Sequence, residues 1–260
     1  MIIMRIRDVR LIMGMPIEIE IVDDSARDTL ESAFAYLVSV DERFSTYKED
    51  SEISRINRSE IESDVVSVEM REVFAIAEKT RIETNGYFNI KKPDSTIDPS
   101  GIVKGWAIRN AAALIREAGY EHYFVNAGGD IATSGKNIDG GEWSVGIRNP
   151  FNSNEIVKVV YPHGKGIATS GSYIRGNHIY NPHNTKEELH DIVSITVIGP
   201  DVLEADRFAT AAFAMGKGGI TFIAQLSGFE GYAINVDGIA TMTSGFAEYT
   251  NPQGDTLRQP

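Results

Sequence analysis

One apolar stretch carries a carboxylate and a hydroxyl at a spacing that suits a metal ion. Residues 205–216 predict a helix in which Asp206 and Thr210 lie four residues apart, and therefore on the same face, one turn apart. Two such oxygen donors suit a small hard cation such as Mg²⁺, which binds few protein ligands and leaves places for water and phosphate oxygens. The same residues also fit an alternative in which Asp206 caps the helix and Thr210 bonds to a backbone carbonyl.

Three further segments combine glycine with polar side chains. Residues 98–107 predict a turn leading into a helix, where free N–H groups suit an anion, Gly101 permits close approach and Lys104 can reach a phosphate. Residues 126–130, Asn-Ala-Gly-Gly-Asp, follow a buried strand, and residues 168–182 combine hydroxyls, an arginine and His178, an imidazole that can act as a base. Taken alone, residues 98–107 also fit an ordinary capped helix, residues 126–130 fit a tight turn at the end of a strand, and His178 fits a structural histidine.

Composition excludes several classes of function. The chain has 260 residues, a formal net charge of −12 and no cysteine. An acidic chain argues against a nucleic-acid-binding surface, and the lack of cysteine excludes disulfides, thiolate nucleophiles and Cys-ligated metals. The first residues lack the apolar run and cleavage site of a signal peptide, and no stretch is long enough to span a membrane. The sequence therefore predicts a soluble, cytoplasmic protein.

Helices early in the chain and strands in its middle are expected to position these segments. Ser25 and Asp28 predict a capping box at the start of the first helix. Val38 is expected on the buried face of that helix, and Leu114 and Ala118 are expected on the buried face of the third helix. Periodicity and capping residues predict helices at residues 25–40, 68–84, 100–118, 205–216 and 219–227. Alternation and turn residues predict strands at 17–22, 122–126, 143–148, 156–161, 166–173, 178–181, 193–198, 232–236 and 239–243. This order favours an α+β fold, and the absence of a linker or repeat predicts one domain over residues 1–260.

Taken in order, these segments resemble the ApbE family of flavin transferases (FAD:protein FMN transferases). The resemblance runs from residue 13 to about residue 243, nearly the whole chain. Each motif is weakly specific alone, whereas their joint order and spacing are strongly specific. The matching motifs are Met13-Gly14, Phe44–Tyr47, Ser51–Asn57, Gly86–Asn89, Asp98–Gly105, Val125–Asp130, Ala168–Tyr173, His178–Pro182 and Ala205–Ala211.

The resemblance implies an α+β fold, Mg²⁺ and a specific reaction. In the family, the FMN half of FAD is moved onto a Thr or Ser hydroxyl of an acceptor flavoprotein, and AMP departs. The resemblance implies His178 as the base and Asp206, Thr210 and the carbonyl of Gly101 as metal ligands. It implies FAD contacts at Met13, Tyr47, Tyr87, Phe88, Asn89, Asp98, Lys104 and Ser194.

Two positions depart from the family's pattern and keep alternatives open. Asn89 stands where the family often has Asp, and Asn181 stands where the family's His-x-Ile-Asp-Pro motif has Asp. One alternative is a pyrophosphatase that uses the same pocket and water to cut FAD into FMN and AMP. Another is a protein that binds FAD without turnover.

Overall fold

The computed structural model describes residues 4–62, 65–172, 179–184 and 191–252, and it is built on one large antiparallel sheet. The strand order is β1-β2-β3-β4-β7-β8-β9-β10, and each neighbouring pair is antiparallel. The strands are β1 (Ile6–Ile12), β2 (Met15–Ile21), β3 (Tyr123–Ala127), β4 (Asp130–Ser134), β7 (Gly166–Gly171), β8 (Ile192–Gly199), β9 (Glu230–Asn235) and β10 (Ala240–Met242). Two further strands, β5 (Val145–Asn149) and β6 (Asn152–Val160), form a separate antiparallel ribbon.

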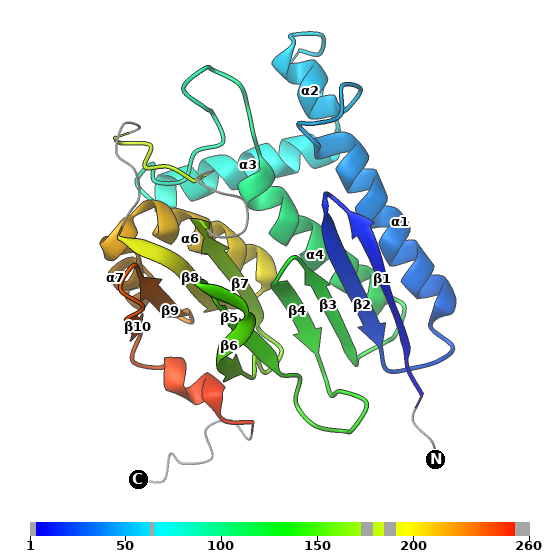
Figure 1. Ribbon diagram of the computed structural model, residues 1–260. Coiled ribbons are helices and arrows are strands. Elements are labelled where there is room, and N and C mark those ends of the chain that lie inside the picture. The colour runs from blue at the N-terminus through cyan, green and yellow to red at the C-terminus, as the bar shows by residue number, and fades with distance from the viewer. Residues whose placement is uncertain (1–3, 63–64, 173–178, 185–190, 253–260) are drawn as a thin grey trace.

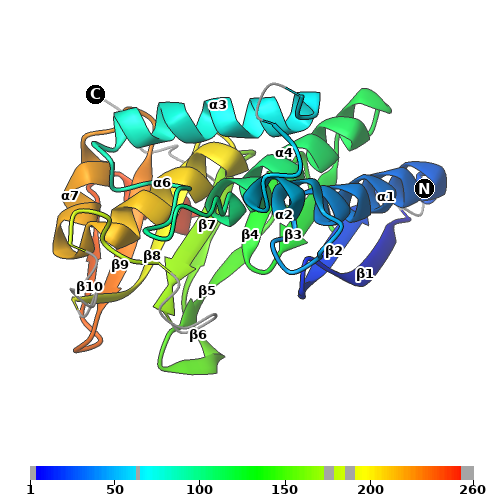
Figure 2. The same ribbon diagram turned by 90° about the horizontal axis from the view of Figure 1, so that it is seen from above.

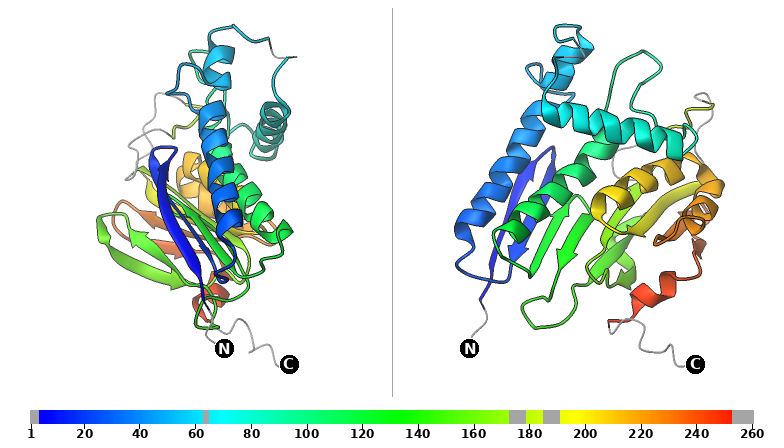
Figure 3. Two further views of the ribbon diagram at one scale, coloured as in Figure 1. Left: turned by 90° about the vertical axis from the view of Figure 1, so that its right-hand side faces the viewer. Right: turned by 180° about the vertical axis from the view of Figure 1, so that it is seen from behind.

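The helices lie on one side of this sheet, and the β5–β6 ribbon projects on the other side (Figures 1 and 2). Seen from behind, α3 runs across the upper ends of α4 and α6 (Figure 3, right). The helices are α1 (Arg27–Phe44), α2 (Glu52–Asn57), α3 (Val68–Glu83), α4 (Ser100–Glu117), α6 (Val202–Ala214) and α7 (Gly219–Ala224). Helices packed on an antiparallel sheet confirm the predicted α+β fold.

The sequence pattern explains why the strands and helices meet in this way. Ile17, Ile19 and Ile21 alternate along β2 and are fully buried, as expected where one face of a strand packs on helices. Helix α6 is buried on almost every side between the sheet and the helices beside it, although it carries the charged residues Glu204, Asp206 and Arg207. The apolar core therefore continues from the sheet through α4 and α6.

A glycine permits unusually close packing between α4 and α6. A Cβ atom added at Gly105 would lie 3.0 Å from the backbone Cα of Leu203 and 2.8 Å from the Cβ of Asp206. Only a residue without a side chain fits such a contact without displacing the backbone. Gly105 thus brings the face of α6 that carries Asp206 directly onto the start of α4.

The predicted helices and most predicted strands are confirmed, with shifted ends, but some details are wrong. The Ser25–Asp28 cap is not formed: the Ser25 hydroxyl donates to Asp23, and α1 begins after Ala26 with no side-chain cap. Val38 is 40% exposed rather than in the inner stripe of α1. Leu114, 37% exposed, and Ala118, also exposed, do not face the core of α4.

Other elements were missed or wrongly predicted. The sequence did not predict β1, β4 or α2. The strand predicted at residues 178–181 is wrong where it is described, because residues 179–181 are irregular. Among the described residues, no helix combines the length and the apolar character needed to cross a membrane.

Candidate active site

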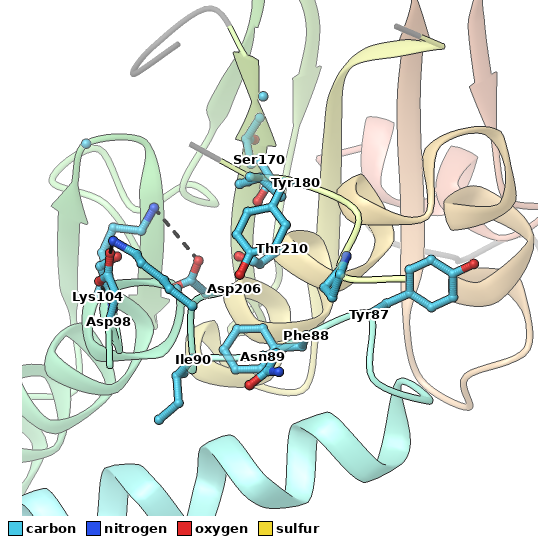
Figure 4. Close-up of a pocket in the computed structure, with 18 residues that line it drawn as sticks. Tyr87, Phe88, Asn89, Ile90, Asp98, Lys104, Ser170, Tyr180, Asp206 and Thr210 are labelled. Carbon is cyan, nitrogen blue, oxygen red and sulfur yellow. Dashed lines mark hydrogen bonds and ion pairs between the residues drawn. The ribbon is translucent and has the colours of Figure 1, made fainter. Parts of the chain in front are cut away.

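A cavity lies where α4, α6, β7 and the segment after α3 converge. Figure 4 shows Asp98 and Lys104 at one end of this cavity, Tyr87 at the other, and Asp206 and Thr210 between them. The cavity is hereafter the first pocket. Its other lining residues are Phe88, Asn89, Ile90, Lys92, Ser100, Gly101, Gly128, Thr169, Ser170, Gly171, Ile179, Tyr180 and Pro182.

Asp206 is a buried carboxylate at the interface of α6 and α4. Its side chain is only 4% exposed, and its Oδ2 accepts a hydrogen bond from the backbone N–H of Gly105 at 2.8 Å. The alternative in which Asp206 caps its helix is wrong, because α6 begins earlier and Asp201 is its cap, accepting from the N–H of Glu204 at 3.0 Å. Burial raises the pKa of the Asp206 carboxyl to about 8, against the lowering effect of the Lys104 cation. A positive charge beside Asp206 therefore stabilises the ionised form of its carboxyl.

Lys104 lies between two buried carboxylates. Its Nζ is 2.6 Å from Oδ2 of Asp130 and 3.8 Å from Oδ1 of Asp206. Asp130 is 1% exposed, and its Oδ1 accepts from the backbone N–H of Thr169 at 3.1 Å. One cation and two carboxylates leave the buried cluster short of positive charge when all three are ionised, since an unbalanced charge is costly away from water.

The residues at this point fit a hard divalent cation. Asp206 and Thr210 both line the first pocket, as does Gly101, where an added Cβ would lie 3.3 Å from Cγ2 of Thr210. The Gly105 N–H donates to Oδ2 of Asp206, which fixes this carboxylate beside the start of α4. Among the described residues, no group of three or more His, Cys, Asp or Glu side chains could hold a metal. Asp206, Thr210 and Gly101 could offer one carboxylate, one hydroxyl and one backbone carbonyl, a combination of oxygens that suits Mg²⁺ bound together with substrate oxygens.

The segment after α3 forms the opposite wall of the first pocket. The Thr84 hydroxyl donates to the carbonyl of Thr80 at 2.7 Å and accepts from the N–H of Phe88 at 3.1 Å, which ends the helix and turns the chain. Phe88 is 4% exposed, and its ring lies against Gly101. The Tyr87 ring meets the ring of His183 at 4.6 Å between centroids. The Phe88 ring therefore lies beside Gly101 and Thr210, and the Tyr87 ring lies at the far end of the pocket.

Asp98 lies where this wall leads into α4. Its Oδ2 is 2.7 Å from Nζ of Lys92, and its Oδ1 accepts from the N–H of Ser100 at 3.1 Å. Burial raises the pKa of the Asp98 carboxyl, but the Lys92 and Ser100 contacts lower it more, so that the pKa lies below its ordinary value. Asp98 is therefore held as an anion beside the first pocket.

A second pocket adjoins the first and shares two of its lining residues, Ser100 and Lys104. Met13, which has a positive φ of 54°, lies in its wall, and so does Tyr47, whose side chain is 97% exposed. The remaining wall comes from Gly14 and Met15, from Val103 of α4, and from the end of α1 and the turn after it, residues 40, 41 and 44–48. The two cavities therefore adjoin at the start of α4, where Ser100 and Lys104 belong to both walls.

The comparison with known families decides what this chain is. The model of the ApbE family matches residues 13–91 and 90–233. The chain belongs to the ApbE family. Proteins named FAD:protein FMN transferase from Salmonella typhimurium and Haemophilus influenzae are similar to it. The first is 31% identical over 174 residues, covering 64% of this chain and 48% of that protein. The second is 24% identical over 294 aligned positions, covering 85% and 84%.

Solved ApbE structures show the same fold. The flavin transferase ApbE from Vibrio cholerae superposes with a TM-score of 0.83 at 23% identity, covering 95% of this chain and 99% of that one. The ApbE protein from Thermotoga maritima superposes with a TM-score of 0.84 at 20% identity, with the same coverage. The curated relatives at about 31% identity are longer proteins, and the match spans only about half of their length.

The structure brings together most of the residues that the ApbE resemblance implied. Tyr87, Phe88, Asn89, Asp98, Lys104, Gly101, Asp206 and Thr210 line the first pocket, and Met13 and Tyr47 line the second. Ser194 does not lie in either wall. It is 2% exposed on β8 beside Gly171, and its neighbour Ile195 packs towards α6, so Ser194 faces the other side of the sheet. His178, the implied base, lies outside the described residues.

Several lining residues were not assigned a role from the sequence. Lys92 and Ile90 come from a short hairpin, which no helical or strand period marked, and Tyr180 comes from an irregular segment where the sequence predicted a strand. The Asp130 carboxylate was noted as a possible functional group, but its ion pair with Lys104 joins residues that lie far apart in sequence. The glycine pair before Asp130 was the only local signal for it.

Proposed function

We propose that this protein is a single-domain enzyme over residues 1–260 that transfers the FMN part of FAD to a Ser or Thr hydroxyl of an acceptor flavoprotein and releases AMP. The observation that carries the proposal is the convergence of Lys104, Asp206, Thr210 and Gly101 in one pocket beside a second cavity. Phosphoryl-type transfer depends on charge neutralisation and positioning more than on covalent chemistry. The relatives with this family's fold include proteins named FAD:protein FMN transferase.

The two adjoining pockets suit a ligand with two large ends and a charged centre. In this proposal the aromatic wall of Tyr87 and Phe88 and the Asn89 side chain bind one end of FAD, and the cavity of Met13 and Tyr47 binds the other. The diphosphate then lies near the residues that the pockets share. Lys104, one of these, adds positive charge there, and the N–H groups at the start of α4 favour an anion.

Asp206, Thr210 and the Gly101 carbonyl would hold Mg²⁺, which when bound would neutralise diphosphate charge and stabilise the leaving AMP. The carboxylates of Asp130 and Asp206 keep the Lys104 ammonium in place, because it is ion-paired with the first and close to the second. Gly105 holds Asp206 by its N–H, so the carboxylate keeps one orientation.

The transfer step forms one bond and breaks one. The hydroxyl oxygen of the acceptor attacks the phosphorus of the FMN half, the bond from that phosphorus to the bridging oxygen breaks, and the bridging oxygen leaves with AMP. The hydroxyl proton passes to a base, for which His178 is the proposed residue. A positioned base contributes roughly 10²–10⁴-fold to such a step.

The proposal is tested with purified protein, FAD, MgCl₂ and a flavoprotein subunit. Equal amounts of AMP and of flavin covalently bound to the subunit, detected by in-gel fluorescence, are expected. Without Mg²⁺, and in a Lys104→Met variant, both products should fall together. Free FMN with AMP, formed at the same rate with or without the subunit, would instead identify a pyrophosphatase. Tight FAD binding with no AMP under any condition would identify a binding protein.

A further inference from the structure

The side-chain amide of Asn57 joins two segments that lie forty residues apart. Asn57 is the last residue of α2, and its Nδ2 donates to the carbonyl of Ile97 at 2.9 Å. Its Oδ1 accepts from the N–H of the same residue at 2.8 Å. Because both ends of one amide bind both backbone groups of one residue, Ile97 is fixed in orientation as well as in position.

The segment held in this way is a small hairpin of residues 90–98, which we call the 90–98 hairpin. Lys91 pairs with Ile97, the N–H of Lys92 donates to Thr96 at 2.8 Å, and the N–H of Asp98 donates to Ile90 at 2.8 Å. Ile90, Lys92 and Asp98 line the first pocket. The hairpin is therefore part of the wall of the candidate active site.

Few other described contacts fix this hairpin to the rest of the molecule. Residues 91–95 are exposed, while Ile90 and Ile97 are partly buried and pack against the core. Among the described residues, its hydrogen bonds other than those to Asn57 join residues within the hairpin or the flanking Asn89 and Ser100. Segments with little buried apolar surface open at low cost, so the loss of two anchoring hydrogen bonds is a large change.

The segment that carries Asn57 is itself held rigidly. The Ser51 hydroxyl caps α2 by accepting from the N–H of Ser54 at 3.1 Å, and Ile53 is fully buried. The Glu52 carboxylate accepts from the N–H and hydroxyl of Ser67, at 2.6 and 2.7 Å, just before α3. Figure 1 shows α2 and the loop between α3 and α4 at the same end of the molecule. Asn57 thus stands on a fixed support.

We propose that Asn57 is a positioning residue that holds the 90–98 hairpin against the first pocket and thereby sets the affinity for FAD. The identity of the ligand rests on the proposed function. A ligand that needs the closed hairpin binds more weakly in proportion to the fraction of molecules in which the hairpin is displaced. Residues that hold Mg²⁺ and the diphosphate lie on α4 and α6, so the turnover rate at saturating FAD should change little.

Two variants remove the contact in different ways. Asn57→Leu has similar size, adds no charge and loses both hydrogen bonds. Asn57→Asp keeps an acceptor for the Ile97 N–H but turns a carboxylate oxygen towards the Ile97 carbonyl. Asn154→Asp is the matched control, because it makes the same chemical change at an exposed residue of β6 in the ribbon. Melting temperatures of the parent and of the three variants show whether each variant is folded.

Two measurements read the position of the hairpin. The first is the Kd for FAD by fluorescence titration, which should rise by roughly tenfold in both Asn57 variants, with kcat at saturating FAD within about twofold. The second is the rate of tryptic cleavage after Lys91 in the absence of FAD, which should also rise by roughly tenfold. Both quantities should stay at the parent value in Asn154→Asp.

The outcomes separate this inference from the proposed function. Unchanged cleavage in both Asn57 variants would overturn it, and so would faster cleavage with an unchanged Kd. If Asn57→Leu does not fold, Asn57→Asp decides by the same two measurements. A parent protein that binds FAD without producing AMP leaves the inference supported by the Kd shift, although the proposed reaction fails. If the parent does not bind FAD at all, the affinity claim is overturned together with the proposed function.

Discussion

Gly105→Ala tests whether the close contact of α4 and α6 positions the candidate metal site. The added Cβ would lie 2.8 Å from the Cβ of Asp206 and 3.0 Å from the Cα of Leu203. Carbon atoms normally meet at about 3.5–4.0 Å, so the two helices must separate locally by roughly 0.5–1 Å. Because Leu203 contributes backbone rather than a flexible side chain, rotation of a side chain cannot relieve the contact.

The expected loss of stability follows from two opposing effects. Overpacking a close contact costs about 1–3 kcal/mol, and replacing Gly by Ala inside a helix returns about 0.8–1 kcal/mol. The free energy of unfolding should therefore fall by about 0–2 kcal/mol, which lowers the melting temperature by up to roughly 8 °C for a chain of this size. Gly218→Ala is the matched control, since Gly218 has a φ of −71° and its nearest neighbour would lie 4.0 Å from an added Cβ.

The effect on activity should exceed the effect on stability. A displacement of about 1 Å at a catalytic group can cost on the order of 10²-fold in rate, and Gly105→Ala moves Asp206 directly. Mg²⁺-dependent AMP release from FAD is measured for the parent, Gly105→Ala and Gly218→Ala at a temperature where all three are folded. Full activity in Gly105→Ala, or an equal loss in Gly218→Ala, would refute the view that this contact positions the site.

Three further changes probe the site and the core. Asp206→Asn keeps an acceptor for the Gly105 N–H but loses the charge, so Mg²⁺-dependent turnover should disappear while the melting temperature changes little; retained turnover would remove Asp206 from the metal site. Phe208 is 4% exposed and packs against the rings of Phe222 and Phe229. Phe208→Ala should therefore lower the free energy of unfolding by about 3–5 kcal/mol, and urea unfolding that shows no such loss would contradict its burial. Burial raises the pKa of Tyr36 from 10.0 to about 12, so the stability that neutral Tyr36 contributes is lost as pH rises from about 10 through 12. The parent should therefore lose more stability than Tyr36→Phe over that pH range. Parallel curves of unfolding free energy against pH for the two proteins would refute this.

The fold was predictable from the sequence wherever one local period dominates. Alternation marked β2, and apolar periodicity with capping residues marked α3 and α4. Helix α2 has six residues, too few for a 3.6-residue period to stand out. Strand β1 carries charged residues on an edge that is open on one side, and its Arg7 is paired with Glu18 across the strand pair. Such strands are stabilised by their neighbours rather than by their own pattern.

The candidate site was predictable in part, for a physical reason. Asp206 and Thr210 are one helical turn apart, so sequence spacing alone placed them together, and the structure brings both to the first pocket. Contacts between distant segments have no local signature. The ion pair of Asp130 with Lys104 is such a contact. The start of α1 instead depends on competition between local hydrogen bonds, because the Ser25 hydroxyl that the capping box required donates to Asp23.

Lys104 and Ser100 belong to the walls of both pockets. A change at either residue should therefore alter the binding free energy in both cavities. Substitutions confined to one wall, such as Tyr47→Ala and Phe88→Ala, lie in different cavities and should combine additively in a double-mutant cycle. Either of them combined with a change at Lys104 should show a coupling energy. A dinucleotide bound across this boundary would therefore have its two ends recognised independently, and each end would be coupled to its centre through Lys104.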